Sequence, residues 1–269
     1  MAKENANIIH FPDFVKLKEE VEKLQTEMSM LISEKSELVL MECKNIEAAY
    51  MLQVGYLEYQ AYELHCTVLR LKRKIEIVQA KKNRQEKIFP DKIEEQLDIE
   101  FKEYKERLNE QLGKLNEAME RAERDILTKE SFQELKKLYR AIVKKLHPDL
   151  HPNMSEEQKN MFLNAVRAYD NGDLDMMRFI HGVVEGMEVY DFDKSGMDAL
   201  KEEKERLAEM LILVRNEINE IKSQYPYILK ELLEDEDKLA AQKISLEKDI
   251  EELKDAVETY QSKLEEMLR

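Results

Sequence analysis

The chain has few residues that interrupt helices and few that build a large core. Its 269 residues include only 6 glycines, 5 prolines and no tryptophan, whereas charged residues make up 38% of the sequence. A compact globule of this length normally contains more Gly, Pro and aromatic residues, and abundant Glu, Lys, Leu and Ala favour helix. The composition therefore predicts an elongated, all-α protein that carries one small globular part.

Cysteine and long apolar segments are also scarce. The two cysteines, Cys43 and Cys66, would lie about 35 Å apart on one helix, which is too far for a disulfide. Free thiols are typical of a reducing cytosol, and no apolar run approaches the ~18 residues of a membrane span. The first residues, MAKENANIIHFPDF, lack the apolar core of a signal peptide. We therefore expect a cytoplasmic protein without a membrane segment.

The formal net charge of −15 argues against a nucleic-acid-binding protein, because phosphate contacts need clustered cations. The basic run from Arg70 to Lys87 is a local exception. It either binds nucleic acid or, as we favour, pairs with acidic residues of a returning helix. The candidate acidic partners are Glu94, Glu95, Asp98 and Glu100.

The sequence contains no pattern typical of a metal site or a catalytic site. His147 and His151 are four residues apart, but Pro148 breaks the helical phase between them and no further ligands cluster nearby. This spacing disfavours a metal site. We find no nucleophile–base pattern and no phosphate-binding loop, so we expect neither catalysis nor a cofactor.

Apolar residues predict a very long first helix. They recur at alternating spacings of three and four from Phe14 to Leu31 and from Ile46 to Val78, which is the pattern of a coiled-coil seam. No proline interrupts residues 13–89, so one helix of about 75 residues and roughly 110 Å is expected. Phe89-Pro90-Asp91 then breaks the pattern, and a second helix over 91–127 returns antiparallel to end opposite about residue 50.

The seam before residue 50 is therefore left without a partner from this hairpin. Either helices from the C-terminal part of the chain fold back onto it, or a second copy covers it, and we favour a homodimer. The stretch from Ala48 to Tyr62 is apolar on more than one face. It either binds a client protein or is buried against several elements.

Three segments follow from these patterns. Residues 1–127 form a helical hairpin arm, and residues 128–190 form a small domain in which Gly, Asn, Pro and His return. Residues 195–269 resume the heptads and form a second hairpin, broken at Tyr225-Pro226-Tyr227. The predicted architecture is thus a pair of long antiparallel, coiled-coil-like hairpins that flank a small helical domain.

A strongly basic helix stands out in the small domain. Ser131 and Glu134 have the spacing of a capping box that starts this helix, and Pro148 ends it at His147. Residues 135–146 hold five cations and no acid. In an acidic chain, such a face is a candidate docking surface for an acidic partner. An exposed polar loop opens at His147, and a further helix begins at Ser155.

This segment resembles helices II and III of the J domain, which are joined by that family's His-Pro-Asp loop. The pair Tyr139-Arg140 lies eight residues ahead of His147, as the family's Tyr-Arg pair does. Residues 162–169 match the family's Phe-x-x-Ile-x-x-Ala-Tyr pattern, with Ala165 in place of Ile. The basic helix II of the family is matched by Lys136, Lys137 and Lys145.

The resemblance implies that the basic helix docks on an acidic surface of a DnaK-type ATPase chaperone and that the loop promotes ATP hydrolysis by that partner. Two departures accompany it. Leu150 and His151 replace the commoner Lys and Asn, which weakens the positive field, and the usual helix I signature is absent. We expect the end of the returning helix, Met119 to Leu127, to take the place of helix I. The implied chaperone-binding residues are His147, Pro148, Asp149, Lys136, Lys137, Tyr139, Arg140, Lys144 and Lys145.

The sequence thus predicts a co-chaperone or adaptor, in which the J domain recruits the ATPase and the helical arms select an unidentified client. A structural coiled-coil scaffold with a non-stimulating J-like domain is the alternative.

Overall fold

A computed structural model describes residues 12–123, 128–187 and 196–269. Every regular element in these ranges is a helix, which confirms the all-α prediction. The chain divides into two compact units, residues 1–44 with 125–225 and residues 45–124 with 226–269. Each unit therefore combines an N-terminal segment with a C-terminal one, and the units do not coincide with the consecutive segments 1–127, 128–190 and 195–269.

The long first helix is present, with two local changes of winding. Residues 12–83 are helical throughout, as α1 (Pro12–Glu37), η1 (Leu38–Glu42), α2 (Cys43–Tyr50), η2 (Met51–Gly55) and α3 (Tyr56–Asn83). The elements η1 and η2 are π-helical turns, in which the chain carries one extra residue per turn. Heptad spacing predicted the helix but carries no signal for these two insertions.

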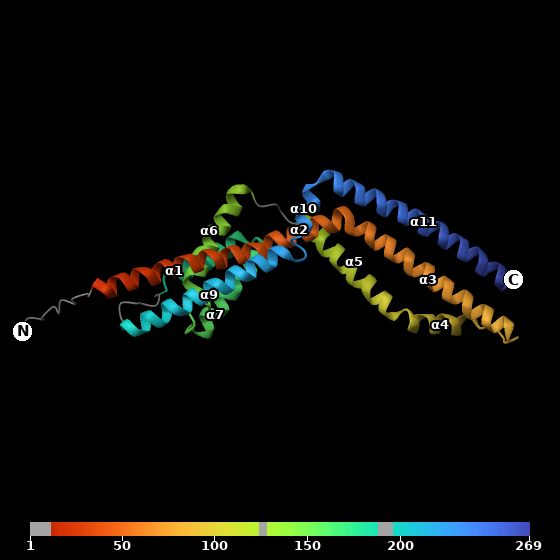
Figure 1. The fold of residues 1–269 in the computed structure, drawn as a ribbon, viewed down its shortest axis with the longest axis horizontal. Coiled ribbons are helices and arrows are strands. Elements are labelled where there is room, and N and C mark those ends of the chain that lie inside the picture. Colours follow the sequence, from red (N-terminus) through yellow and green to blue (C-terminus); the bar gives the residue numbers. More distant parts are fainter. Residues whose placement is uncertain (1–11, 124–127, 188–195) are drawn as a thin grey trace, which may run out of the picture. The chain divides into compact units, whose positions relative to one another are not determined.

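In the first unit, α9 (Met197–Ser223) lies along α1 and runs parallel to it (Figure 1). The direction follows from the interhelical ion pairs, whose residue numbers increase together along both helices. These pairs are Glu20–Lys204 at 2.6 Å, Glu27–Arg215, and Glu34–Lys222 at 2.8 Å. The three glutamates are seven residues apart, as expected for the flanking positions of a heptad seam.

The α1 seam is buried in this pairing. Val21, Met28 and Ile32 of α1 are at most 3% exposed. The buried residues of α9 are Leu200, Leu207, Leu211, Val214 and Ile218. The fold-back alternative thus describes the chain, and the seam gives no reason to expect a second copy at this place.

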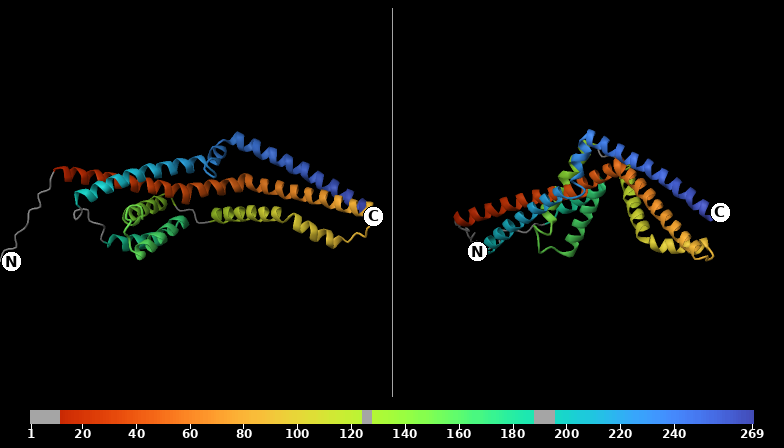
Figure 2. Two further views of the ribbon diagram at one scale, coloured as in Figure 1. Left: turned by 60° about the horizontal axis from the view of Figure 1, so that its bottom comes forward. Right: turned by 45° about the vertical axis from the view of Figure 1, so that its right-hand side comes forward.

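In the second unit, α3 is followed by α4 (Pro90–Glu100) and α5 (Lys102–Glu123), which return antiparallel to it (Figure 2). The returning helix is divided at Phe101. Its end meets the start of the unit, because Arg121 Nε donates to Asn45 Oδ1 at 2.8 Å. The prediction that it ends opposite about residue 50 is confirmed.

The basic run of α3 pairs with the returning helix, as favoured from the sequence. The ion pairs are Arg70–Glu94 at 2.5 Å, Arg70–Asp98 at 2.8 Å, Arg73–Glu100 at 2.8 Å and Lys74–Glu94. Beyond them, Lys81 lies 3.7 Å from Glu86 in the connection. These cations are thus engaged within the chain, which weakens the nucleic-acid interpretation of the run.

The third partner in this unit is α11 (Glu236–Leu268), preceded by the short α10 (Leu229–Glu234). It runs parallel to α3. Gln242 Nε2 donates to Tyr50 Oη at 3.5 Å, and further along both helices Lys72 Nζ lies 5.0 Å from the centre of the Tyr260 ring. The predicted C-terminal hairpin of residues 195–269 is therefore wrong as a packing unit. The helices α9 and α11 each find a parallel partner in the N-terminal segment.

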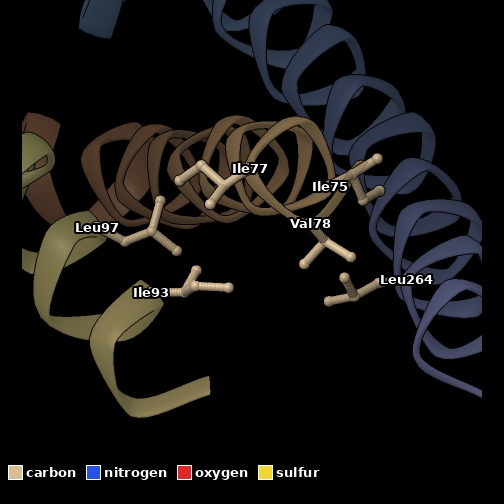
Figure 3. Close-up of a cluster of buried hydrophobic side chains, with 6 residues drawn as sticks. All are labelled: Ile75, Ile77, Val78, Ile93, Leu97 and Leu264. Atoms are coloured by element: carbon tan, nitrogen blue, oxygen red, sulfur yellow. The ribbon is translucent and has the colours of Figure 1, made fainter. Parts of the chain in front are cut away.

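Two apolar clusters hold the second unit together. Figure 3 shows the first, where side chains from α3, α4 and α11 meet: Ile75, Ile77, Val78, Ile93, Leu97 and Leu264. The second joins Tyr50, Met51, Val54, Ala118 and Leu239. The apolar stretch from Ala48 to Tyr62 thus contributes to a core shared by several helices, which supports burial over client binding for its inward residues.

Residues 129–185, which include the basic helix, form three short helices in the first unit. They are α6 (Lys129–Leu146), α7 (Glu156–Asn171) and α8 (Leu174–Glu185). The cap of α6 is Thr128, whose Oγ1 accepts from Ser131 N at 3.2 Å, so the helix starts earlier than the predicted Ser131 cap. The predicted helix start at Ser155 is confirmed, since Ser155 caps α7 in a capping box, and Gly172 ends that helix with a φ of 69°.

The α1–α9 seam gives a first prediction. Changing Leu207, which is 0% exposed, to Ala should lower the free energy of unfolding by about 2–5 kcal/mol, because a buried leucine is replaced by a cavity. Urea unfolding followed by circular dichroism measures the change. The matched control is Ile212→Ala on the same helix, since Ile212 is 60% exposed. Equal losses in the two variants would contradict the packing of α9 on α1.

Candidate functional site

The site is built on a tight pair of helices, α6 and α7. The rings of Tyr139 and Tyr169 stack with their centres 4.3 Å apart. Ala165, 0% exposed, lies on the buried face of α7, where its small side chain allows close approach of a neighbouring helix. The third face of this pair is closed by α8, which Arg178 joins to Glu134 of α6 through two hydrogen bonds of 2.8 and 2.7 Å.

The helix that completes this core is α1, not the returning helix. Tyr139 Oη lies 3.2 Å from Ser36 Oγ, and Lys136 pairs with Glu37. At the start of α2, Lys44 Nζ donates to both carboxylate oxygens of Asp170 at 2.6 and 2.8 Å. The expectation that residues 119–127 replace helix I is therefore wrong, because α1 packs against α6 and η1 packs against α7. Residues 124–127 lie outside the described residues.

The connection between α6 and α7, residues 147–155, is called the HPD loop below. It is closed by its own hydrogen bonds. The carbonyl of His147 accepts from the amides of Leu150 at 3.0 Å and His151 at 2.9 Å, and His147 Nδ1 accepts from Asp149 N at 3.1 Å. His151 Nε2 lies 2.8 Å from Lys144 O and so satisfies a carbonyl at the end of α6. The loop is a defined turn rather than an open connection.

The side chain of His147 points inward. It is 17% exposed and meets Phe162 edge-on, with ring centres 5.0 Å apart. A cavity of about 230 Å³ lies beside it, lined among others by Ile32, Lys35 and Val214. Burial lowers the pKa of His147, against the opposing effect of the Asp149 carboxylate. The expectation that the whole loop is exposed is therefore wrong for this residue.

The other residues of the loop divide between core and solvent. Pro148 is exposed, and the Asp149 side chain is 44% exposed. Leu150, in contrast, is buried at 4% exposure. A lysine at position 150 would place a charge in a buried position. Packing therefore explains why Leu150 stands where the J-domain pattern more commonly has Lys. The accessible polar group of the tripeptide is the Asp149 carboxylate.

The five cations of residues 135–146 on α6 also divide into two groups. Lys136 pairs with Glu37, and Lys145 Nζ donates to the carbonyls of Val184 and Glu185, both at 3.2 Å, at the end of α8. The remaining three, Lys137, Arg140 and Lys144, are exposed and are called the basic face below. Arg140 has Glu37 at a limiting 4.0 Å. Of the nine residues suggested by the sequence, Tyr139, Lys136, Lys145 and His147 thus make internal contacts.

One contact to the loop was missed by the sequence analysis. Arg206 of α9 donates from Nη1 to the main-chain carbonyl of Asp149 at 2.8 Å. Its guanidinium is held in turn by Glu203 through two hydrogen bonds of 2.7 Å. The spacing of Glu203 and Arg206 suggests a helical ion pair, but nothing in the sequence indicates that the pair faces residue 149.

Comparison with known proteins adds no assignment to this geometry. No protein-family profile, curated protein or solved structure matches the chain. Within the ranges that the structure describes, no group of three or more His, Cys, Asp and Glu side chains is placed to hold a metal ion. Nor is any described helix long and apolar enough to cross a membrane.

The buried imidazole predicts a pH-dependent stability. Its folded pKa lies below the ordinary 6.5 of an exposed histidine, so below about pH 6.5 the unfolded chain binds more protons than the folded one. The stabilising contribution is complete above that value and is lost as the pH falls. Urea unfolding at about pH 7.5 and about pH 5.5, on either side of the histidine range, measures it.

The variant His147→Gln is the comparison, because all other titrating groups are shared. It should lose less stability between the two pH values than the wild-type protein does. Identical losses in the two proteins would show that His147 is solvated in the folded state.

Proposed function

We propose that this protein is a co-chaperone or adaptor whose residues 128–190 act as a J domain and recruit a DnaK-type ATPase chaperone. The observation that carries the proposal is the combination of an exposed basic face with an adjacent loop that presents the Asp149 carboxylate to solvent. Exposed cations and an exposed carboxylate are groups that bind oppositely charged groups of another protein.

The basic face is suited to an acidic partner. Lys137, Arg140 and Lys144 recur at spacings of three and four, so they project from one side of α6. Their charges stand out in a chain of net charge −15, and such local fields steer association with an oppositely charged surface. The acidic surface of a DnaK-type nucleotide-binding domain is the partner that the J-domain resemblance implies.

The loop is suited to a single directional contact. The Asp149 carboxylate can accept two parallel hydrogen bonds from an arginine of the partner. Pro148 restricts the backbone before it, while His147 and Leu150 hold the loop on the helix pair from inside. In this proposal His147 shapes the loop, and Asp149 makes the contact that promotes ATP hydrolysis.

The helices outside residues 128–190 are proposed to select where the chaperone acts, as arms that bind a client or a scaffold protein. A reducing, cytoplasmic setting is proposed with them, because neither Cys43 nor Cys66 forms a disulfide. The second candidate function is a structural scaffold that stimulates no ATPase. The internal contacts of Lys136 and Lys145 favour it, since they engage cations that the resemblance assigns to docking.

ATP hydrolysis separates the two candidates. The protein should accelerate single-turnover ATP hydrolysis by a DnaK-type chaperone, and Asp149→Asn should abolish the acceleration, because the amide cannot form a paired carboxylate contact. The fold should be retained, since the Asp149 side chain is 44% exposed. No acceleration by the wild-type protein with a cognate partner would favour the scaffold.

Charge reversal tests the docking surface separately. Replacing Lys137, Arg140 and Lys144 by Glu should weaken binding to the chaperone, and rising salt should weaken wild-type binding, because exposed charges are screened beyond about 10 Å at 0.1 M salt. Fluorescence anisotropy at several salt concentrations measures both effects.

The matched control reverses three exposed lysines elsewhere, Lys201, Lys254 and Lys263, which changes the net charge by the same amount. If the control weakens binding as much as the reversal on α6, net charge rather than the basic face governs association.

A further inference from the structure

The HPD loop is fixed from outside its own helix pair by α9. The hydrogen bond from Arg206 Nη1 to the Asp149 carbonyl, 2.8 Å long, joins residues that are 57 positions apart in the sequence. The carbonyl belongs to the residue whose side chain the proposed function uses. Holding this carbonyl fixes the peptide plane that follows Asp149, because the peptide unit is planar, and so limits where the carboxylate points.

The donor is itself held in place. Glu203, one turn earlier on α9, accepts from Arg206 Nε and Nη2 at 2.7 Å each, in the paired geometry that orients a guanidinium best. The Glu203 side chain is largely buried. With two of its nitrogens committed to Glu203, the guanidinium presents Nη1 toward the loop.

The position of α9 is fixed in turn by the seam with α1. The ion pairs of Lys204 with Glu20 and of Lys222 with Glu34 hold α9 against α1 on both sides of Arg206. Leu207, next to Arg206, is fully buried. The loop is therefore held on α7 by the contact of His147 with Phe162 and on α9 by the hydrogen bond from Arg206.

We infer that Arg206, oriented by Glu203, is a positioning residue that holds the Asp149 carboxylate in the geometry needed to stimulate the chaperone. The inference rests on the proposed function. It separates binding of the chaperone from stimulation of its ATP hydrolysis, because Arg206 contacts the loop and not the basic face. Loss of Arg206 should impair the stimulated rate and leave the affinity set by Lys137, Arg140 and Lys144 unchanged.

The test compares Arg206→Met with Arg215→Met. Both changes keep a long apolar stem and remove a guanidinium from α9, and both wild-type residues make an ion pair. Only the first removes a donor to the loop. Single-turnover ATP hydrolysis by a DnaK-type chaperone is measured over a range of concentrations of the full-length variant, which gives a maximal rate and a half-saturating concentration.

Arg206→Met should lower the maximal rate about ten-fold, less than the roughly 100-fold that a 1 Å misplacement of a reacting group can cost, with an unchanged half-saturating concentration. Arg215→Met should leave both values at the wild-type level. Arg206→Lys should recover part of the rate, since an ammonium can still donate to the Asp149 carbonyl. A wild-type or raised maximal rate in Arg206→Met, or a change confined to the half-saturating concentration, would overturn the inference.

Amide hydrogen exchange in the free protein provides a readout that does not depend on the chaperone. Arg206→Met should speed exchange at Leu150 and His151, whose amides close the loop on the His147 carbonyl, and Arg215→Met should not. If the wild-type protein fails to stimulate ATP hydrolysis, the proposed function fails while this measurement still decides whether Arg206 positions the loop. Unchanged exchange in Arg206→Met contradicts the inference in either case.

The variant Glu203→Gln tests the same arrangement if Arg206→Met fails to fold. It leaves the Arg206 hydrogen bond possible but removes the charge that orients the guanidinium. An intermediate rate and intermediate exchange at Leu150 support the two-residue arrangement, and wild-type values for both would show that Glu203 has no part in it.

Discussion

Burial of the apolar seam on the N-terminal helical run is the constraint on which the rest of the structure depends. An apolar stripe left in water would forgo about 25 cal/mol for each Å² that could be buried. The helices α9 and α11 provide the cover, and both run parallel to the helix they cover. A parallel partner within one chain cannot follow a tight turn, so it has to come from a distant part of the sequence. The small domain of α6 to α8 lies in the chain between α1 and its partner α9.

This arrangement explains why the candidate site contacts both helices of the first seam. Ser36 and Glu37, at the end of α1, meet Tyr139 and Lys136 of α6. From α9, Arg206 reaches the carbonyl of Asp149. The α6–α7 pair packs against α1 in addition to α8, and the Tyr139 hydroxyl lies 3.2 Å from Ser36 Oγ of α1. As a result, the geometry of the loop depends on the register of a coiled-coil-like pair.

Local signals in the sequence predicted local structure well. The predicted break at Pro90 begins α4, and the predicted helix start at Ser155 caps α7. Each of these depends on neighbours within a few residues, as capping and turn chemistry do. The same reason accounts for the basic run of α3, because a short connection places its acidic partners opposite it.

Partner choice could not be predicted in this way. A heptad pattern specifies which face of a helix is apolar, but it leaves the direction and identity of the partner open. Glu20, Glu27 and Glu34 pair with cations of α9 in the parallel arrangement, and that match is visible only once the pairing is known. The inward position of His147 was missed for a related reason, since its neighbours come from α1 and α7 rather than from the loop.

The distribution of cations on α6 bears on the choice between an adaptor and a scaffold. Lys136 and Lys145 each satisfy a group within the chain, so a structural role accounts for them. Lys137, Arg140 and Lys144 instead lie on one exposed side at spacings of three and four, where like charges destabilise a helix by about 0.2–0.5 kcal/mol per pair. The packing of α6 does not explain this small cost. An acidic partner would offset it, because its negative charges attract all three cations. The proposed adaptor uses these three exposed cations, whereas the proposed scaffold gives them no role.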